Sequence, residues 1–370
     1  MAKLLHISAN MYPPLYGPHH HTKNIWKELS KDFDEYHILA RSETNRYSYS
    51  KEGNMHLHLV PKITQKSKIF FFTSFWMFYI IKKYKITHLL SQCPIVGGYA
   101  ATLASKTFKI PLMVEVHDEV YFTQMENNLL IRFFAKNGFE KSTKIRSLGN
   151  LMTQNIKKYI SNPKKIVEIP TRVNLKLFKY KKENFDIKNT IKIVSVGRFH
   201  PDKGYDKLIK AIALLKKELH FDINLTLIGG GNLKNEYLKI AKEFNFEDNL
   251  ILYDWLSQEE FQQYVINSDI YVQSSILEGL PRSVLEAMAM RMPIITTDVG
   301  VIRDVIKNEF NGLVIQKDNI EEIKKSIMNL IQDKEKRERI AYNAYKTIKD
   351  KYEWNKIFEK YRYEILNMEV

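Results

Sequence analysis

The chain has 370 residues, of which 44% are apolar and 27% are charged. This length exceeds the usual size of one hydrophobic core, so two domains are expected, and the composition excludes a disordered chain. Cys93 is the only cysteine, which excludes an intramolecular disulfide and favours a reducing compartment. The apolar run at the start is too short for a secretory signal, so we expect a cytoplasmic protein.

The net charge of +15 is unevenly distributed. Residues 1–187 contain 29 Lys and Arg against 14 Asp and Glu, whereas the remaining residues contain 28 of each class. Such a basic half attracts phosphates, anionic lipid headgroups or nucleic acid. Solvated surface lysine is the alternative interpretation.

Short apolar runs alternate with longer segments of helical periodicity, which predicts βα units around parallel sheets. In the first half the predicted strands are 4–7, 36–39, 56–59, 88–90, 112–116 and 166–169. In the second half they are 191–196, 224–228, 250–253, 270–273, 294–296 and 312–315. The sequence therefore predicts an α/β fold of two Rossmann-like, doubly wound domains, 1–178 and 191–349, joined by a polar linker over 179–190. Ligand is expected at the carboxyl ends of the strands, in a cleft between the domains.

The aromatic segment over residues 66–85 has two interpretations. Its uncharged centre, Ile69 to Ile81, is shorter than the roughly 20 residues that a membrane-spanning helix needs. The favoured interpretation is a helix buried against the sheet. The flanking lysines also suit a helix in the interface of an anionic membrane, which would make the protein peripheral at the inner membrane face.

The C-terminal segment predicts one more helix. Over residues 350–370, the side chains of Trp354, Ile357, Phe358 and Tyr361 recur at helical intervals and form one apolar stripe. We expect this helix to complete the N-terminal domain.

The loop after the predicted strand 191–196 carries two cations. Gly197 turns the chain, and Arg198 and Lys203 flank a short loop that opens onto a helix. A diphosphate is suited to this pattern, because Arg offers a planar fork of donors and Lys a mobile point charge. Two solvated surface cations beside a turn are the alternative.

A second segment places two acids around a helix start. Pro281 suits the first turn of a helix, so Glu278 is predicted in the loop before it and Glu286 more than one turn inside it. The amides near Leu280, Arg282 and Ser283 would point at an anion. Glu286 could accept the hydroxyl protons of a ribose, and Glu278 would then face a transferred sugar.

Together these segments resemble family 4 of the retaining glycosyltransferases, which belong to the glycosyl transferases group 1 and have the GT-B fold. The resemblance covers roughly residues 190 to 315. Its pattern consists of Gly197-Arg198 with Lys203-Gly204, Gly229-Gly230-Gly231, and Glu278 with Glu286 followed by Ala287-Met288-Ala289.

The resemblance implies a metal-independent enzyme that transfers a hexose-type sugar from a nucleoside-diphosphate-sugar with retention of configuration. Arg198 and Lys203 would hold the diphosphate, Glu286 the ribose and Glu278 the donor sugar. No cofactor is expected, and a cell-surface polysaccharide or lipid-linked oligosaccharide is the expected acceptor. The further donor contacts implied are Gly230, Gly279, Leu280, Pro281, Arg282 and Ser283, with Trp255 as a wall of the base pocket.

The N-terminal half matches the family more loosely. Gly17 is a candidate donor contact, because it lies in a loop where the family's glycine pair lets the backbone approach the donor, and Pro18 replaces the second glycine. His117 ends a predicted strand, as the family's sugar-contacting histidine does, so it is the candidate for a donor-sugar hydroxyl. A packed or surface histidine is the alternative. Arg291 also departs from the pattern, because it occupies a usual glycine position after Ala-Met-Ala.

Other functions fit the sequence less well. The run His19-His20-His21 suggests a metal site, but consecutive residues converge poorly on one ion, so no metal is expected there. A Rossmann oxidoreductase would need a glycine fingerprint after the first strand, where the chain has Tyr-Pro-Pro. A basic nucleic-acid-binding protein would need a recognition motif, and none is evident, so no nucleic acid partner is expected. A sugar-nucleotide epimerase of GT-B fold remains the nearest rival.

Overall fold

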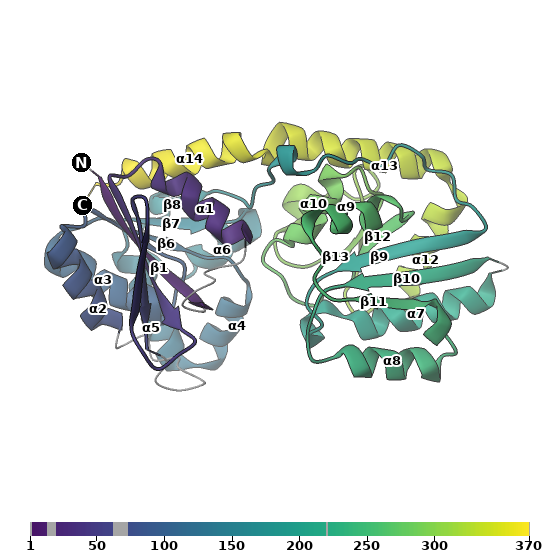
Figure 1. Ribbon diagram of the computed structural model, residues 1–370, viewed down its shortest axis with the longest axis horizontal. Coiled ribbons are helices and arrows are strands. Elements are labelled where there is room, and N and C mark those ends of the chain that lie inside the picture. Colours follow the sequence, from purple (N-terminus) through teal and green to yellow (C-terminus); the bar gives the residue numbers. More distant parts are fainter. Residues whose placement is uncertain (1, 13–19, 62–72, 220, 370) are drawn as a thin grey trace. The chain divides into compact units, whose positions relative to one another are not determined.

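The computed structural model describes residues 2–12, 20–61, 73–219 and 221–369, and the chain divides into two compact units. The first domain comprises residues 1–169 and 358–370, and the second comprises residues 170–357. Each is built around a largely parallel sheet with helices packed on it (Figure 1). This confirms the predicted α/β class of two doubly wound domains.

The first domain contains an eight-stranded sheet in the order β3-β4-β2-β1-β5-β6-β7-β8. Its pairs are parallel except for β3 with β4. The strands are β1 (Lys3–Tyr12), β2 (Glu35–Ser42), β3 (Ser48–Glu52), β4 (Met55–Val60), β5 (His88–Ser91), β6 (Leu112–Glu115), β7 (Lys144–Ser147) and β8 (Ile166–Glu168). The helices are α1 (His20–Ser30), α2 (Thr73–Tyr84), α3 (Val96–Phe108), α4 (Val120–Asn127), α5 (Leu129–Lys141) and α6 (Asn150–Lys157).

Helix α2 lies within the aromatic segment of residues 66–85, of which residues 66–72 are outside the described part of the chain. Met77 and Ile80 are fully buried, so one face of α2 packs into the domain, as the favoured interpretation predicts for this part of the segment. Its outer face is also apolar, because Phe75 is 71% exposed and Tyr79 is exposed as well. Among the described residues, no helix combines the length and the hydropathy required to cross a bilayer.

The second domain contains a six-stranded parallel sheet in the order β11-β10-β9-β12-β13-β14. Helices α7 and α8 lie on one side of this sheet and α10 on the other (Figure 1). The strands are β9 (Thr190–Val196), β10 (Asp222–Ile228), β11 (Leu250–Tyr253), β12 (Ile270–Gln273), β13 (Ile294–Thr297) and β14 (Leu313–Ile315). The helices are α7 (Tyr205–Glu218), α8 (Lys234–Glu243), α9 (Gln258–Ile266), α10 (Arg282–Ala289), α11 (Ile302–Val305), α12 (Ile320–Gln332) and α13 (Lys334–Thr347).

The polar segment 179–190 is assigned to the second domain. Lys182 is buried there, and its ammonium donates to the Ser268 carbonyl at 2.7 Å. Phe185 is also buried, and its carbonyl accepts from the guanidinium of Arg337 at 2.7 Å. The segment is therefore held against its own domain, and it forms no helix or strand before β9 begins at Thr190.

The C-terminal segment forms a π-helical turn (Ile348–Tyr352) and then α14 (Trp354–Leu366). Its predicted apolar stripe is buried at Trp354, Phe358 and Tyr361. Trp354 belongs to the second domain, where the Arg172 guanidinium lies 4.9 Å from its ring centroid. Phe358 and Tyr361 belong to the first domain, so residues of one helix contribute to both cores.

Candidate active site

The loop between β9 and α7 carries the two predicted cations. A short 3-10 turn, Pro201–Lys203, leads to Gly204, which has a φ of 61° and precedes α7. A Cβ atom at Gly204 would stand 2.3 Å from the carbonyl oxygen of Ser274. Glycine at this position therefore allows the loop to approach the loop after β12. The two loops are joined by a hydrogen bond of 2.7 Å from the Ile276 amide to the Asp202 carbonyl.

Lys203 and Glu278 are in direct contact. The Lys203 ammonium donates a short hydrogen bond to Oε1 of Glu278, and both side chains are mostly buried. The Ser275 hydroxyl donates to the same oxygen at 2.9 Å. The structure thus brings together two residues that the sequence placed in separate motifs, and it adds Ser275, which the sequence analysis did not select.

Arg198 is more exposed than Lys203. Its side chain is 66% exposed, and its terminal nitrogen lies 3.7 Å from a carboxylate oxygen of Asp202. This contact is long and solvated, so it restrains the guanidinium weakly. An incoming anion could therefore recruit Arg198 without breaking a buried ion pair.

The two acids of the second motif lie on either side of the start of α10, with Glu278 in the preceding loop and Glu286 inside the helix. Arg282 begins the helix, and its Nε lies 3.2 Å from Oε1 of Glu286. Desolvation raises the pKa of the Glu286 carboxyl above its ordinary value, and Arg282 opposes this shift. Burial raises the pKa of the Tyr271 hydroxyl, and the charges of Glu286 and Glu278 add to the shift. Tyr271 on β12 is therefore within electrostatic reach of both acids.

The loop that holds Glu278 is fixed by another close backbone contact. Gly300 has a φ of 55°, and a Cβ atom there would stand 2.0 Å from the carbonyl oxygen of Gly279. The Val301 amide donates to the same carbonyl at 2.9 Å. Leu280 is buried and Pro281 precedes the helix, so the first amides of α10 begin directly after this fixed loop. Those amides, which include Arg282 and Ser283, have no acceptor within the helix.

The glycine-rich turn after β10 packs on the cation loop. A Cβ atom at Gly229 would stand 2.1 Å from the Gly197 carbonyl oxygen, and the Phe199 amide donates to the Gly230 carbonyl at 2.8 Å. The indole Nε1 of Trp255 would lie 3.1 Å from a Cβ atom at Gly230. Trp255 is 61% exposed, so it is not a core residue, and the space beside Gly230 is walled by an aromatic ring.

In the first domain, His117 follows β6 and is one-third exposed. Its Nε2 lies 3.1 Å from Oε2 of Glu115, a carboxylate that is fully buried. The other oxygen of Glu115 accepts from the Arg146 guanidinium at 2.7 Å and from the Tyr361 hydroxyl at 2.8 Å. Burial disfavours the charge on Glu115, but Arg146 and His117 hold the pKa of its carboxyl well below the ordinary value.

This supporting network was not predicted from the sequence. Glu115 directly follows the apolar run Leu112–Val114, and a charged residue in such a position signals a buried ion pair, whereas Arg146 lies in the polar strand β7 and gives no such signal. Tyr361 was selected only as part of an apolar stripe. Gly17 and the side chains of His19, His20 and His21 lie outside the described residues.

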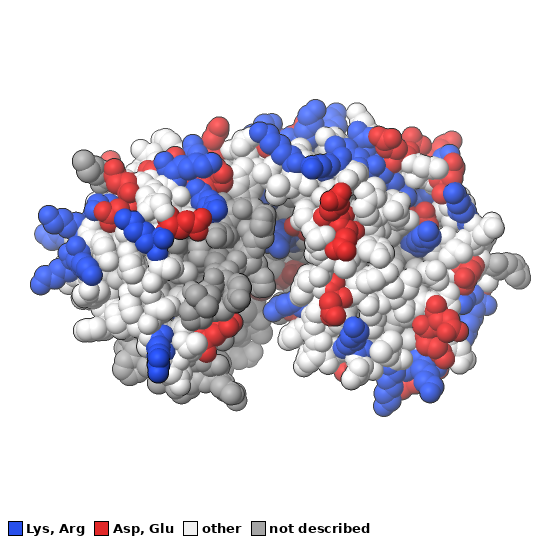
Figure 2. Space-filling view, viewed as in Figure 1, with Lys and Arg blue, Asp and Glu red and all other residues white. Residues whose placement is uncertain are grey.

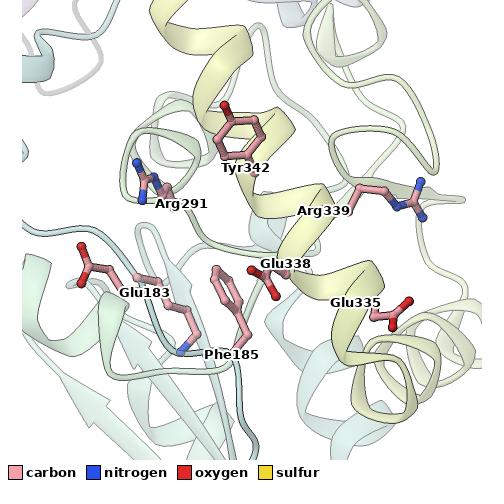
Figure 3. Close-up of a pocket in the computed structure, with 8 residues that line it drawn as sticks. Glu183, Phe185, Arg291, Glu335, Glu338, Arg339 and Tyr342 are labelled. Carbon is pink, nitrogen blue, oxygen red and sulfur yellow. The ribbon is translucent and has the colours of Figure 1, made fainter.

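The surface of the second domain has a mixed charge distribution and an open pocket. Figure 2 shows Lys and Arg interspersed with Asp and Glu on its visible face, in keeping with the balanced charge of the C-terminal half. An open pocket of about 750 Å³ is lined by Phe185, Arg291 and Tyr342 among others (Figure 3). It includes none of the predicted site residues. Arg291 has a φ of 57°, so the usual glycine position is left-handed here too.

Comparison with known proteins agrees with these motifs. Residues 178–347 match the family model of the glycosyl transferases group 1. The chain is 27% identical to an uncharacterised glycosyltransferase of Methanocaldococcus jannaschii over 350 residues, 93% of each chain. It is 26% identical over 268 residues, 68% of each chain, to the Escherichia coli UDP-Gal:alpha-D-GlcNAc-diphosphoundecaprenol alpha-1,3-galactosyltransferase.

Solved structures extend the likeness to the whole fold. The sucrose-phosphate synthase of Thermosynechococcus elongatus superimposes with a TM-score of 0.81 at 17% identity, covering 98% of this chain and 99% of that one. Residues 178–347 therefore match the glycosyl transferases group 1 family, and the chain is a glycosyltransferase of GT-B fold.

Proposed function

We propose that this glycosyltransferase moves a hexose-type sugar from a nucleoside-diphosphate-sugar to a lipid-linked oligosaccharide or cell-surface polysaccharide, with retention of configuration and without a metal ion. The contact between Lys203 and Glu278 carries the proposal. It joins a cation suited to a phosphate and an acid suited to a sugar at the carboxyl ends of β9 and β12.

The proposed chemistry is electrostatic. The nucleoside diphosphate gains negative charge as its bond to the sugar breaks, so Arg198 and Lys203 would stabilise the transition state more than the ground state. These two cations would do the work for which other transferases use a divalent ion. Glu278 is held by Lys203 and Ser275 and would contact the transferred sugar.

The remaining donor contacts follow from the same loops. Glu286 would accept ribose hydroxyl protons, and the amides at Arg282 and Ser283 would face the diphosphate. Trp255 would stack on the base beside Gly230. His117, oriented by Glu115, would contact a hydroxyl of the donor sugar.

The acceptor assignment is supported by a relative and by a surface. The Escherichia coli relative acts, by its name, on a diphosphoundecaprenol-linked sugar. On α2 the exposed Phe75 and Tyr79 are followed by Lys82 and Lys83 near the helix end. Exposed aromatic rings beside lysines suit the interface of an anionic membrane, so we infer peripheral attachment through this helix.

The decisive experiment combines donor binding with product analysis. Titration with UDP-, GDP- and ADP-sugars identifies the donor, and mass spectrometry of lipid and polysaccharide fractions identifies the product. NMR of the product reports its anomeric configuration, and the assay is repeated with a chelator. We expect an α-linked product from an α-linked donor, with unchanged turnover in the chelator.

Matched variants connect this activity with the site. Lys203→Ala and Glu286→Ala should each reduce kcat/KM at least 100-fold, whereas Lys207→Ala, which removes the same charge from the first turn of α7, should leave it unchanged. Wild-type turnover in both site variants would contradict the assignment. Conversion of the donor into an epimer without acceptor would favour the rival function.

A further inference from the structure

A cluster of buried imidazoles lies in the first domain, on one face of its sheet. Glu35 and His37 are two residues apart on β2, and His56 on the neighbouring β4 is the direct partner of His37. Side chains two residues apart on a strand, and those of paired residues on adjacent strands, point to the same face. One ligand atom from each of these three residues lies within 4.8 Å of the other two.

Further side chains contact the Nδ1 atoms of these imidazoles. His37 Nδ1 lies 3.0 Å from Nε2 of His58, and His58 Nδ1 lies 2.9 Å from the Tyr47 hydroxyl. His56 Nδ1 lies 2.9 Å from the Tyr49 hydroxyl. Metal-binding histidines are oriented in this way, because a partner on one ring nitrogen fixes the other nitrogen as the ligand.

The nitrogen that remains on His56 is the second observation. His56 is 5% exposed, and its Nε2 is buried without a hydrogen-bond partner among the described residues. A buried nitrogen without a partner carries a desolvation cost unless an ion or water satisfies it. One ring nitrogen of His56 lies within 4.8 Å of ligand atoms of Glu35 and His37.

We propose that Glu35, His37 and His56 form a binding site for a divalent transition-metal ion, with zinc as the best fit. Two neutral imidazoles and one carboxylate match the ligands of zinc, whereas calcium and magnesium prefer sites made of oxygen alone. A water molecule would complete a four-coordinate site. None of these residues belongs to the proposed donor site, so this inference does not rest on the proposed function.

Binding can proceed without a change in the net number of protons on the cluster. Without the ion, His37 Nε2–H donates to Glu35 at 3.0 Å, and His58 Nε2–H donates to His37 Nδ1. With the ion on His37 Nε2, the rings of His37 and His58 would each carry their proton on Nδ1. His37 would then donate to His58, and His58 would donate to the Tyr47 hydroxyl oxygen, which reverses the direction of these hydrogen bonds. The rings of His37 and His56 lie nearly parallel, with their centroids 4.3 Å apart, so one of the two rings must turn before a nitrogen of each can bind the same ion.

Lys3 competes with the ion. Its ammonium donates to Oε1 of Glu35 at 2.7 Å and leaves Oε2 for His37. Removing this positive charge should strengthen metal binding, whereas removing the phenol hydroxyl of Tyr49 should weaken it. Two variants with opposite expected effects distinguish a specific metal site from nonspecific binding to surface histidines.

The test measures zinc affinity of the untagged full-length protein, prepared metal-free, by competition with a chromophoric chelator. We expect Lys3→Met to bind several-fold more tightly than the wild type, Tyr49→Phe to bind about 10-fold more weakly, and His56→Gln to lose this site. Cobalt should give the intense visible absorption of a four-coordinate site. His88→Gln, another histidine of the same sheet, should bind as the wild type does.

The histidines at positions 19 to 21 are present in every variant, so their background binding cancels in the comparison. Should His56→Gln fail to fold, Lys3→Met and Tyr49→Phe still test the site. Equal zinc affinity in the wild type, Lys3→Met and Tyr49→Phe would overturn the proposal, as would absence of binding by the wild type.

Discussion

The Tyr361 hydroxyl donates a 2.8 Å hydrogen bond to the buried carboxylate of Glu115, although the two residues are 246 positions apart in the chain. The same carboxylate accepts from Arg146 and contacts His117 through its second oxygen. The Arg146 guanidinium also lies over the Tyr361 ring, 4.7 Å from its centroid. The C-terminal helix therefore supports the residue that orients His117.

Replacing Tyr361 with Phe should destabilise the first domain by about 1 kcal/mol, because the buried Glu115 loses one donor while the ring stays in place. Urea unfolding measures this loss. Tyr363→Phe on the same helix is the control, since Tyr363 is 64% exposed. Equal unfolding midpoints for the two variants would contradict the role given to the Tyr361 hydroxyl.

A positioning role for Tyr361 has a second consequence. If Glu115 orients His117 toward the donor sugar, Tyr361→Phe should raise KM for the donor or lower kcat beyond its effect on folding. Assays well below the unfolding temperature separate these effects. Unchanged kinetic constants would leave Tyr361 a purely structural residue.

Replacing Arg198 with Gln should separate catalysis from stability. The side chain is largely exposed and only weakly paired with Asp202, so the unfolding free energy should change by less than about 0.5 kcal/mol. Transfer should nevertheless fall 100-fold or more if Arg198 neutralises the departing diphosphate. Arg303→Gln, which removes an exposed arginine paired with Asp298, is the control for a general charge effect. Loss of stability without loss of turnover would reverse the interpretation.

The strands that surround the site could be predicted because they are apolar and end in recognisable turns. Every predicted strand has a counterpart in the structure, including 191–196 and 270–273, whose ends carry the cation loop and the acid loop. The acid motif was also placed correctly, with Glu278 before the helix and Glu286 more than one turn inside it. These features follow from local patterns of about ten residues.

Two strands were missed because their residues do not look like strand residues. β3 (Ser48–Glu52) is polar and mostly exposed, and it is held by antiparallel pairing with β4. β7 (Lys144–Ser147) contains Arg146, whose charge is compensated by Glu115 on the neighbouring strand. The contact of Tyr361 with that pair depends on the return of the chain's last helix, which no local pattern specifies.

Gly204 and Gly53 offer a matched test of close backbone packing. Their φ angles are 61° and 62°, but a Cβ atom at Gly53 would meet no atom of the described residues within 4 Å, whereas at Gly204 it would collide with Ser274. Gly53→Ala should therefore cost only about 1 kcal/mol of left-handed strain. Gly204→Ala should cost clearly more and should also reduce transfer, because the loop that carries Lys203 must move. Thermal unfolding of both variants measures the difference, and equal costs would show that the loop contact is unimportant.

His6 predicts one part of the pH dependence of stability. It is fully buried on β1, and desolvation lowers its pKa to about 4, with Glu115 and Gln92 opposing the shift and His117 adding to it. An imidazole in the unfolded chain has a pKa of about 6.5, so the unfolded state takes up this proton first as the pH falls.

The contribution of neutral His6 is therefore complete above pH 6.5 and is lost as the pH falls toward 4, by up to roughly 1.4 kcal/mol per pH unit. His6→Gln removes this titration, while the other buried histidines titrate as before. Urea unfolding in chelator between pH 7 and 4.5 should give a shallower decline for His6→Gln than for the wild type. Parallel declines would mean that His6 takes up its proton at the same pH in the folded and the unfolded chain, in conflict with its burial beside Trp26 and Tyr36.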